Sequence, residues 1–180
     1  RPDSAKNFMD AIHKCFLVIQ NLKSLLKSNK MLTNVGDEGG FAPSIKTNEE
    51  ALELIVNAIE KSKLIPGKDI AICLDVAANE LINNEGHYSI QSSNFASVDN
   101  VINYYKKLTS DYPIKSIEDP FAEEDWLAWK KITAEIGNSI QIVGDDLFAT
   151  NTERLKNGID EKSANSILVK PNQIGTLTET

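Results

Sequence analysis

Residues 140–145 read IQIVGD, a short apolar run that ends on the acid Asp145. Three other apolar runs also end on a charged residue, at Asp75, Glu118 and Lys170. The segments between these runs carry helical patterns, so the repeating unit is a strand, a polar residue, a loop and a helix. This alternation predicts an α/β fold with a parallel sheet whose carboxyl ends share one side, which is where such sheets bind ligands.

The composition is that of an ordinary globular domain. The chain has 180 residues, of which 41% are hydrophobic, and this is enough for one packed core. The formal net charge of -7 argues against general binding to nucleic acid or anionic lipid. We find neither a secretory signal nor an apolar stretch near the roughly 20 residues of a membrane span, and we expect a cytoplasmic protein. Cys15 and Cys73 are expected to be reduced core residues.

Several segments carry the apolar spacing of amphipathic helices. The longest runs from about Ser4 to Lys27. Thr47 with Glu50, and Thr150 with Glu153, have the spacing of capping boxes and predict the first turns of two more helices.

Two segments lack a clear helical pattern. Residues 31–36 are a weak strand candidate, and residues 76–96 form a long irregular stretch of the kind that often carries function. The chain then holds about five strand–helix units, which leaves a doubly wound sheet and part of a barrel as alternatives. A closed barrel takes about 250 residues, so if these units belong to a barrel, part of it is missing here. Since the chain opens on Arg1 and stops at Thr180, in an expected helix after Gly175, we expect an excised segment.

The acids at three strand ends predict a metal site. Neighbouring parallel strands lie about 4.8 Å apart, which puts the carboxylates of Asp75, Glu118 and Asp145 within roughly 10 Å of one another. At an effective dielectric near 20, two like charges 4 Å apart cost about 4 kcal/mol, so these groups either take up protons or hold a cation. An all-oxygen ligand set favours Mg²⁺ over zinc. Lys170 is then a candidate general base, because a nearby cation lowers the pKa of an ammonium group.

Each of these residues also has a simpler interpretation. An acid after a strand is commonly a helix N-cap, and Asp145 with Asp146 could cap the helix that follows. Lys170 alone could be a strand-end lysine with its amine in water. The glycines of residues 36–40 resemble a phosphate cradle, but the acids among them, including Glu38, would repel phosphate. We expect that loop to present its acids.

Five motifs resemble the enolase family, in the family's order and near its spacing, over essentially the whole chain. They are NVGDEGGFAP (34–43), LDVAA (74–78), SIEDP (116–120), VGDDL (143–147) and KPNQIGTLTET (170–180). The resemblance implies an α/β fold, a partial TIM-like (enolase-type) β/α barrel of about five βα units that is incomplete at both ends. Residues 1–180 would be a fragment of the carboxy-terminal catalytic barrel domain, with the amino-terminal domain absent. Enolase-superfamily sites are known for a lysine or histidine base that works with one or two Mg²⁺ ions.

The resemblance implies a glycolytic lyase, phosphopyruvate hydratase. This enzyme removes the C2 proton of 2-phosphoglycerate and expels the C3 hydroxyl, giving phosphoenolpyruvate. By resemblance Lys170 is the base, Glu38 assists loss of the hydroxyl, and Asp146 positions Lys170. The Mg²⁺ ligands would be Asp75, Glu118 and Asp145.

The resemblance also implies how the chain works in a longer protein. The loop after Asp75 would be a mobile loop that closes over substrate, and the full-length parent would form a homodimer or larger homo-oligomer. The family is reported at cell surfaces and as a secreted pool as well as in the cytoplasm. Asn79 stands where many relatives have serine. Because the family's remaining active-site residues lie outside residues 1–180, we expect the isolated segment to be inactive.

Three other functions compete with this interpretation. A related proton-abstracting barrel enzyme of the same superfamily would share the metal acids, but its bases come as Lys-x-Lys on a strand, whereas residues 61–63 fall at a helix end. A Mg²⁺-binding phosphoacceptor signalling domain also joins an acidic pair to a Lys-Pro, but there the pair follows the first strand. Here Asp145 and Asp146 come third among the acids. A non-catalytic binding role stays open.

Overall fold

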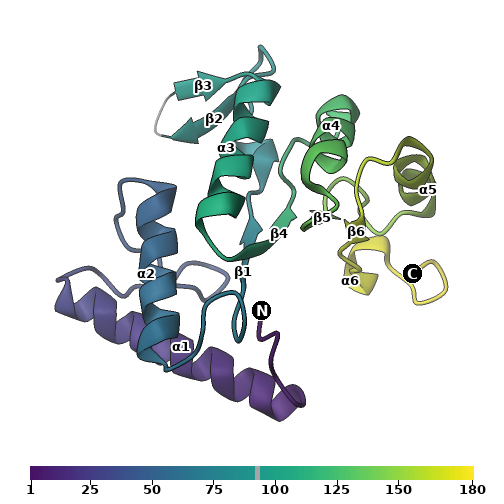
Figure 1. The fold of residues 1–180 in the computed structure, drawn as a ribbon. Coiled ribbons are helices and arrows are strands. Elements are labelled where there is room, and N and C mark those ends of the chain that lie inside the picture. Colours follow the sequence, from purple (N-terminus) through teal and green to yellow (C-terminus); the bar gives the residue numbers. More distant parts are fainter. Residues whose placement is uncertain (92–93) are drawn as a thin grey trace. The chain divides into compact units, whose positions relative to one another are not determined.

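The structure is a computed structural model that describes residues 1–91 and 94–180 (Figure 1). The chain forms two compact units, residues Arg1–Ile72 and Cys73–Thr180. The first unit is mainly helical, and the second carries the sheet and the strand-end residues.

The first unit is built on two helices, α1 (Phe8–Ser28) and α2 (Asn48–Lys61), that pack against each other (Figure 1). The side chain of Thr47 accepts a hydrogen bond from the amide of Glu50 at 3.2 Å, which confirms the predicted start of α2. Near the contact, Asn21 Nδ2 donates to Ser62 Oγ at 3.0 Å. In the described part of the chain, no helix combines the length and apolarity needed to cross a bilayer.

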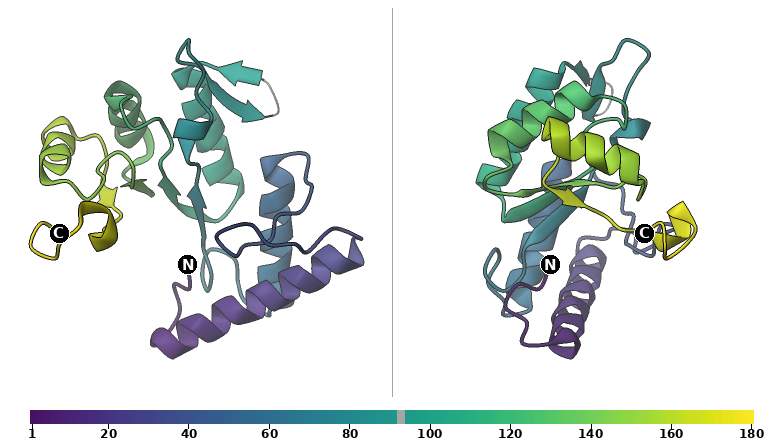
Figure 2. Two further views of the ribbon diagram at one scale, coloured as in Figure 1. Left: turned by 180° about the vertical axis from the view of Figure 1, so that it is seen from behind. Right: turned by 90° about the vertical axis from the view of Figure 1, so that its right-hand side faces the viewer.

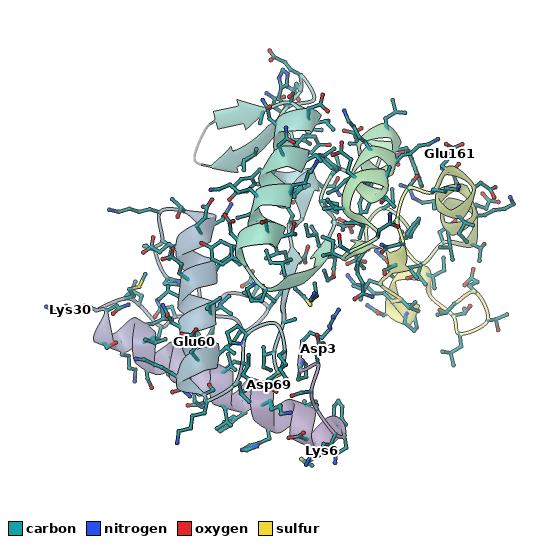
Figure 3. All side chains as sticks on the ribbon, in the orientation of Figure 1. Asp3, Lys6, Lys30, Glu60, Asp69 and Glu161 are labelled. Carbon is teal, nitrogen blue, oxygen red and sulfur yellow. The ribbon has the colours of Figure 1, made fainter. Side chains whose placement is uncertain are left out.

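The apolar stripe of α1 is buried only near its carboxyl end. Leu25 and Leu26 are buried, at 8% and 1% exposure. Four earlier members of the stripe are more than half exposed, namely Phe8, Ile12, Phe16 and Ile19. The segment before α1 is held by residues near β1, because the amide of Ser4 donates to the carbonyl of Asp69. Figure 3 labels Asp69 and the neighbouring Asp3.

Residues 31–36 do not form the strand that was predicted. Only an isolated bridge between Val35 and Phe41 forms there, and it closes the glycine-rich loop. Within the loop the amide of Gly36 donates to the carbonyl of Gly40 at 2.8 Å, and Gly39 takes a φ of +83° that favours glycine. Glu38 is exposed, as the sequence predicted for the acids of this loop.

The second unit contains a four-stranded sheet in the order β1-β4-β5-β6. The strands are β1 (Ile72–Asp75), β4 (Ile114–Glu118), β5 (Gln141–Gly144) and β6 (Ser166–Ile167). The β4–β5 and β5–β6 pairs are parallel. Strand order follows chain order without the reversal that creates the switch point of a doubly wound sheet, and this progression is that of a barrel.

Three helices cover one side of this sheet (Figure 2): α3 (Val98–Asp111), α4 (Trp126–Ile136) and α5 (Thr152–Glu161). The buried faces of α3 and α4 are apolar, and Trp129 and Ile132 of α4 are fully buried. Salt bridges join neighbouring helices on the outside, including Lys130 Nζ to Glu161 Oε2 at 2.8 Å (Figure 3). This placement of α3, α4 and α5 on the same side is a further barrel feature, because consecutive helices of a doubly wound sheet cover both of its faces.

The described residues of the stretch 76–96, namely 76–91 and 94–96, are more ordered than the sequence predicted, and residues 92–93 lie outside the described part. The stretch contains a short 3₁₀ helix η1 (Ala78–Glu80) and a two-stranded antiparallel hairpin, β2 (Tyr88–Gln91) with β3 (Asn94–Ala96). Tyr88 is 2% exposed and anchors the hairpin: its hydroxyl donates to Asp125 Oδ2 at 2.8 Å and accepts from the amide of Ala122 at 3.2 Å. Packing and hydrogen bonds at Tyr88 thus anchor β2, which carries no periodic sequence pattern.

Three smaller predictions are wrong. The N-cap of α5 is Asn151, not Thr150. Cys73 is exposed and Cys15 is half-buried, so neither is a core residue. A short helix, α6 (Pro171–Ile174), precedes Gly175, and turns rather than a helix follow it.

Gly158→Ala is expected to destabilise the second unit by about 1–3 kcal/mol, because overpacking a closed core forces side chains off their rotamers. A Cβ at position 158 would lie 2.3 Å from Cε1 of the buried Phe148 ring. The neighbouring exposed residue of α5 supplies the control, since Asn157→Ala adds no contact and improves helix propensity. Urea-denaturation midpoints measure both variants, and equal midpoints would contradict the close packing.

Candidate metal centre and general base

The strand-end residues are staggered across the sheet. Glu118 pairs with Val143, so Asp145 lies two residues further along β5. The β5–β6 ladder pairs Gly144 with Ile167. Lys170 is therefore again two residues further along than Asp145. Residues two apart on a strand face the same side, and a constant stagger is what a barrel requires. The strand ends are not level as we expected, but the stagger keeps the functional side chains on one face.

Asp145 is the most buried of the predicted metal ligands, at 7% exposure. Its Oδ2 accepts a hydrogen bond from Lys170 Nζ, which confirms that the sheet brings the acid and the lysine together. Its Oδ1 is buried with no hydrogen-bond partner among the described residues. A buried carboxylate oxygen without a partner is costly, and a cation at this position would satisfy it.

Glu118 lies in an environment that disfavours its charge. Partial burial, followed by the negative charges of Asp75 and Asp145, raises the pKa of Glu118 to about 7. The positive charge of Lys170 acts in the opposite direction but is a smaller effect. The charges of Asp75, Asp145 and Lys170 thus all act on Glu118.

Asp119 is a site residue that the sequence analysis missed. It is 5% exposed, and its two carboxylate oxygens accept hydrogen bonds from the amides of Asp145 and Asp146, both at 3.0 Å. Its own amide donates to the carbonyl of Val143, and its φ is +41°. Burial raises the pKa of Asp119, although the two amide bonds act against this. Asp119 therefore fixes the backbone of the acidic pair to the end of β4.

Three aromatic residues hold the segment that follows Asp119. Tyr105 donates from its hydroxyl to the carbonyl of Pro120 at 3.0 Å, and Trp129 donates from Nε1 to the carbonyl of Ala122 at 3.1 Å. Tyr88 accepts from the amide of Ala122, as described above. Because all three side chains are buried, the loop that follows Glu118 has little freedom to move.

Lys170 is anchored at both its backbone and its amine. Its amide donates to Thr150 Oγ1 at 2.8 Å, and its Nζ donates to Asp145. The hydrogen bond to Asp145, more than any other influence, raises the pKa of Lys170. The lowered pKa expected of a base does not follow from the protein alone, and it would require the charge of a bound cation to compete for Asp145.

Asp146 contacts the long loop rather than Lys170. Its Oδ2 accepts from Asn79 Nδ2 at 3.0 Å, and Asn79 Oδ1 accepts from the amide of Glu123 at 3.0 Å. Asn79 thus links Asp146 to the loop between β4 and α4. The predicted effect of Asp146 on Lys170 is electrostatic only, since the negative charge of Asp146 contributes to the raised pKa of the amine.

The tightest group of acids differs from the predicted ligand set. Among the described residues, carboxylate oxygens of Asp119, Asp145 and Asp146 all lie within 4.8 Å of one another. Asp119 is a poor ligand in this geometry because both of its oxygens already accept backbone hydrogen bonds. Asp75 lies close enough to Glu118 to raise its pKa, and one of its own oxygens accepts from the amide of Ala77 at 3.2 Å.

Two alternative interpretations lose support here. Asp145 and Asp146 do not cap α5, because Asn151 accepts from the amides of Glu153 and Arg154. Residues 61–63 end α2 and contribute no base from a strand, as the sequence predicted. Glu38 belongs to the first unit, so its catalytic role remains a prediction.

Comparison with known proteins identifies relatives over the whole chain. The family described as "Enolase, C-terminal TIM barrel domain" matches residues 1–180. The chain is 58% identical over 180 residues to the enolase of Pelagibacter ubique (strain HTCC1062), covering 100% of this chain and 43% of that protein. It is 53% identical over 179 residues to the enolase of Ehrlichia ruminantium (strain Gardel), covering 99% of this chain and 42% of that protein. The chain thus spans less than half the length of these relatives. Its fold, its strand-end residues and its sequence place it in the enolase family, within the carboxy-terminal TIM barrel domain.

Proposed function

We propose that residues 1–180 are the central part of the catalytic barrel of an enolase. The full-length enzyme would be a Mg²⁺-dependent lyase that converts 2-phosphoglycerate to phosphoenolpyruvate in glycolysis. The observation that best supports this is the state of Asp145, with one oxygen paired to a lysine amine and the other buried without a partner among the described residues. An amine held beside an unsatisfied carboxylate is an arrangement suited to a metal site with an adjacent base.

The Mg²⁺ ligands in this proposal are Asp75, Glu118 and Asp145. Burial, and after it the negative charges of Asp75 and Asp145, raises the pKa of Glu118, and a divalent cation would relieve the repulsion among the three carboxylates. Oxygen ligands are those that Mg²⁺ prefers, and the bound ion would stabilise negative charge that develops on the substrate carboxylate.

Lys170 would take the C2 proton of the substrate. Its side chain is 39% exposed, so the amine can reach a ligand while its stem stays anchored at the strand end. The negative charge of Asp146 would act on the amine of Lys170 and help to position it. Glu38 would assist loss of the C3 hydroxyl. A general base contributes about 10²- to 10⁴-fold to the rate when it is held in place.

The remaining features of the parent follow from the family. We propose an amino-terminal domain outside these residues, a homodimer or larger homo-oligomer, a cytoplasmic location with a surface or secreted pool, and no nucleic-acid partner. The acidic balance of the chain agrees with the last of these.

Phosphoenolpyruvate formation from 2-phosphoglycerate tests the proposal, with and without Mg²⁺. We expect turnover by the full-length parent and none by the purified 180-residue chain, because the resemblance to the family implies that further active-site residues lie outside residues 1–180. An inactive parent that is folded and loaded with Mg²⁺ would refute the proposed function. An active 180-residue chain would refute only the claim that the segment is insufficient.

Mg²⁺ affinity should depend on pH through Glu118. Below its pKa of about 7 this carboxyl carries a proton that Mg²⁺ must displace, so affinity falls as the pH falls. Between about pH 8 and about pH 6 we expect roughly a tenfold loss, which calorimetry on the parent would measure. Glu118→Gln should weaken binding at both pH values and remove the step. A step that persists in the variant would assign the titration to another group.

A further inference from the structure

Thr150 lies in the loop between β5 and α5, within the polar surroundings of Lys170. It is 6% exposed, and its Oγ1 accepts a hydrogen bond from the amide of Lys170 at 2.8 Å. The two residues are 20 positions apart in sequence, so the contact joins the loop after one strand to the end of the next.

The hydroxyl of Thr150 is available for this contact because a different residue, Asn151, is the N-cap of α5. Asn151 Oδ1 accepts from the amides of Glu153 and Arg154 and thus completes the first turn of α5. A threonine directly before a helix usually serves as its cap. Here the cap is the next residue, Asn151, and the hydroxyl of Thr150 accepts from the amide of Lys170 instead.

The backbone at Thr150 is strained in a way that the surroundings maintain. Its φ is +50°, and Ala149 before it has a φ of +46°. Positive φ is rare for a β-branched residue and persists only where neighbouring contacts enforce it. The amide of Ala149 donates to the carbonyl of Asp145 at 2.8 Å, and the amide of Asn151 donates to the carbonyl of Phe148 at 2.8 Å. The same tight loop therefore carries Asp145 at its start and Thr150 at its end.

The bond to Thr150 ties the amide of Lys170 to the loop before α5, whereas the carbonyl of Lys170 accepts from the amides of Gln173 and Ile174 in the short helix that follows. The amide of Leu168 donates to the carbonyl of Gly144, and this is the preceding anchor along the chain. Pro171 has no N–H, so the amide of Lys170 is the last backbone donor before α6. Loss of this bond would free the amide of Lys170 while leaving the lysine amine paired with Asp145.

We propose that Thr150 is a positioning residue for the catalytic base: its hydroxyl fixes the backbone of Lys170 so that the amine approaches the substrate from a defined direction. The inference rests on the proposed function, in which Lys170 takes the proton. Misplacing a reacting group by about 1 Å costs on the order of a hundredfold in rate, so a single anchoring bond can matter.

Two substitutions in the full-length parent separate the hydroxyl from the shape of the side chain. Thr150→Val keeps the β-branch and the strained backbone but removes the acceptor, whereas Thr150→Ser keeps the acceptor. We expect Thr150→Val to lower kcat by about 10- to 100-fold with little change in KM, and Thr150→Ser to stay within about threefold of the unchanged enzyme. Exchange of the C2 proton of 2-phosphoglycerate with solvent should fall in parallel with kcat.

Exchange of the Lys170 amide with solvent gives a readout that does not depend on turnover. This amide should be protected in the unchanged parent and in Thr150→Ser, and exposed in Thr150→Val, while Mg²⁺ affinity stays the same in all three. If Thr150→Val turns over at the normal rate in an active parent, or leaves the amide protected, the inference is wrong. An inactive unchanged parent would instead overturn the proposed function, and the amide measurement would still decide whether Thr150 anchors Lys170.

Discussion

Asp119→Ala is expected to lower the free energy of unfolding by about 3 kcal/mol, because it removes the hydrogen-bond acceptor of two backbone amides. Those amides belong to Asp145 and Asp146, and the variant leaves both without the bonds that fix them at 3.0 Å. We also expect Mg²⁺ affinity to fall at least about tenfold, since the backbone that presents the metal ligand is no longer held.

Two further substitutions separate the causes of this effect. Asp119→Asn keeps one acceptor oxygen and tolerates the φ of +41°, so its loss of stability should be smaller than that of alanine. Asp111→Ala, at an exposed helix end, should change stability by less than about 0.5 kcal/mol. Urea denaturation and Mg²⁺ calorimetry on the parent check both expectations. Equal losses for Asp119→Ala and Asp111→Ala would show that the two amide bonds contribute nothing.

The sequence predicted the strand-end residues because their signal is local. An apolar run that stops on a charged residue marks both the strand and the residue at its carboxyl end, and all four runs lead to strands that are neighbours in the same sheet. The helices α3 and α4 were predictable for the same reason, since their apolar spacing matches the faces that become buried.

The residues that organise the site carry no such signal. Asp119 and Thr150 act through side chain–backbone bonds to residues 20 or more positions away, and nothing in their local sequence indicates the partner. The prediction that Thr150 caps α5 failed because its neighbour Asn151 is an equally good cap. Competition between two adjacent capping residues is settled by tertiary contacts, which local rules do not include.

The stagger of the strands could not be read from the sequence either. The alternation of residues along a strand determines which face of the sheet a residue occupies, but it does not determine which residue of the neighbouring strand lies beside it. The two-residue offset between Glu118 and Asp145 arises from the backbone ladder. Despite this offset the two strand ends are joined by a side-chain hydrogen bond, because Asp119, directly after β4, accepts from the amide of Asp145, directly after β5.

Lys170→Ala in the full-length parent should reduce turnover and C2 proton exchange by about 10²- to 10⁴-fold, the range associated with a positioned general base. The same change should leave Mg²⁺ binding intact or tighten it, because the amine competes with a cation for Asp145 in the metal-free protein. If Lys170 only supported the fold, its loss would reduce both turnover and Mg²⁺ binding, rather than turnover alone.

Lys170→Arg sharpens the test because it keeps the positive charge but cannot release a proton near neutral pH. We expect this variant to be as inactive as Lys170→Ala, while Mg²⁺ affinity stays nearer that of the unchanged enzyme. Lys156→Ala, on the exposed face of α5, is the control for loss of a surface lysine and should retain full turnover. If Lys170→Arg were active, the role of position 170 would be to supply charge, and the proton acceptor would have to lie elsewhere in the enzyme.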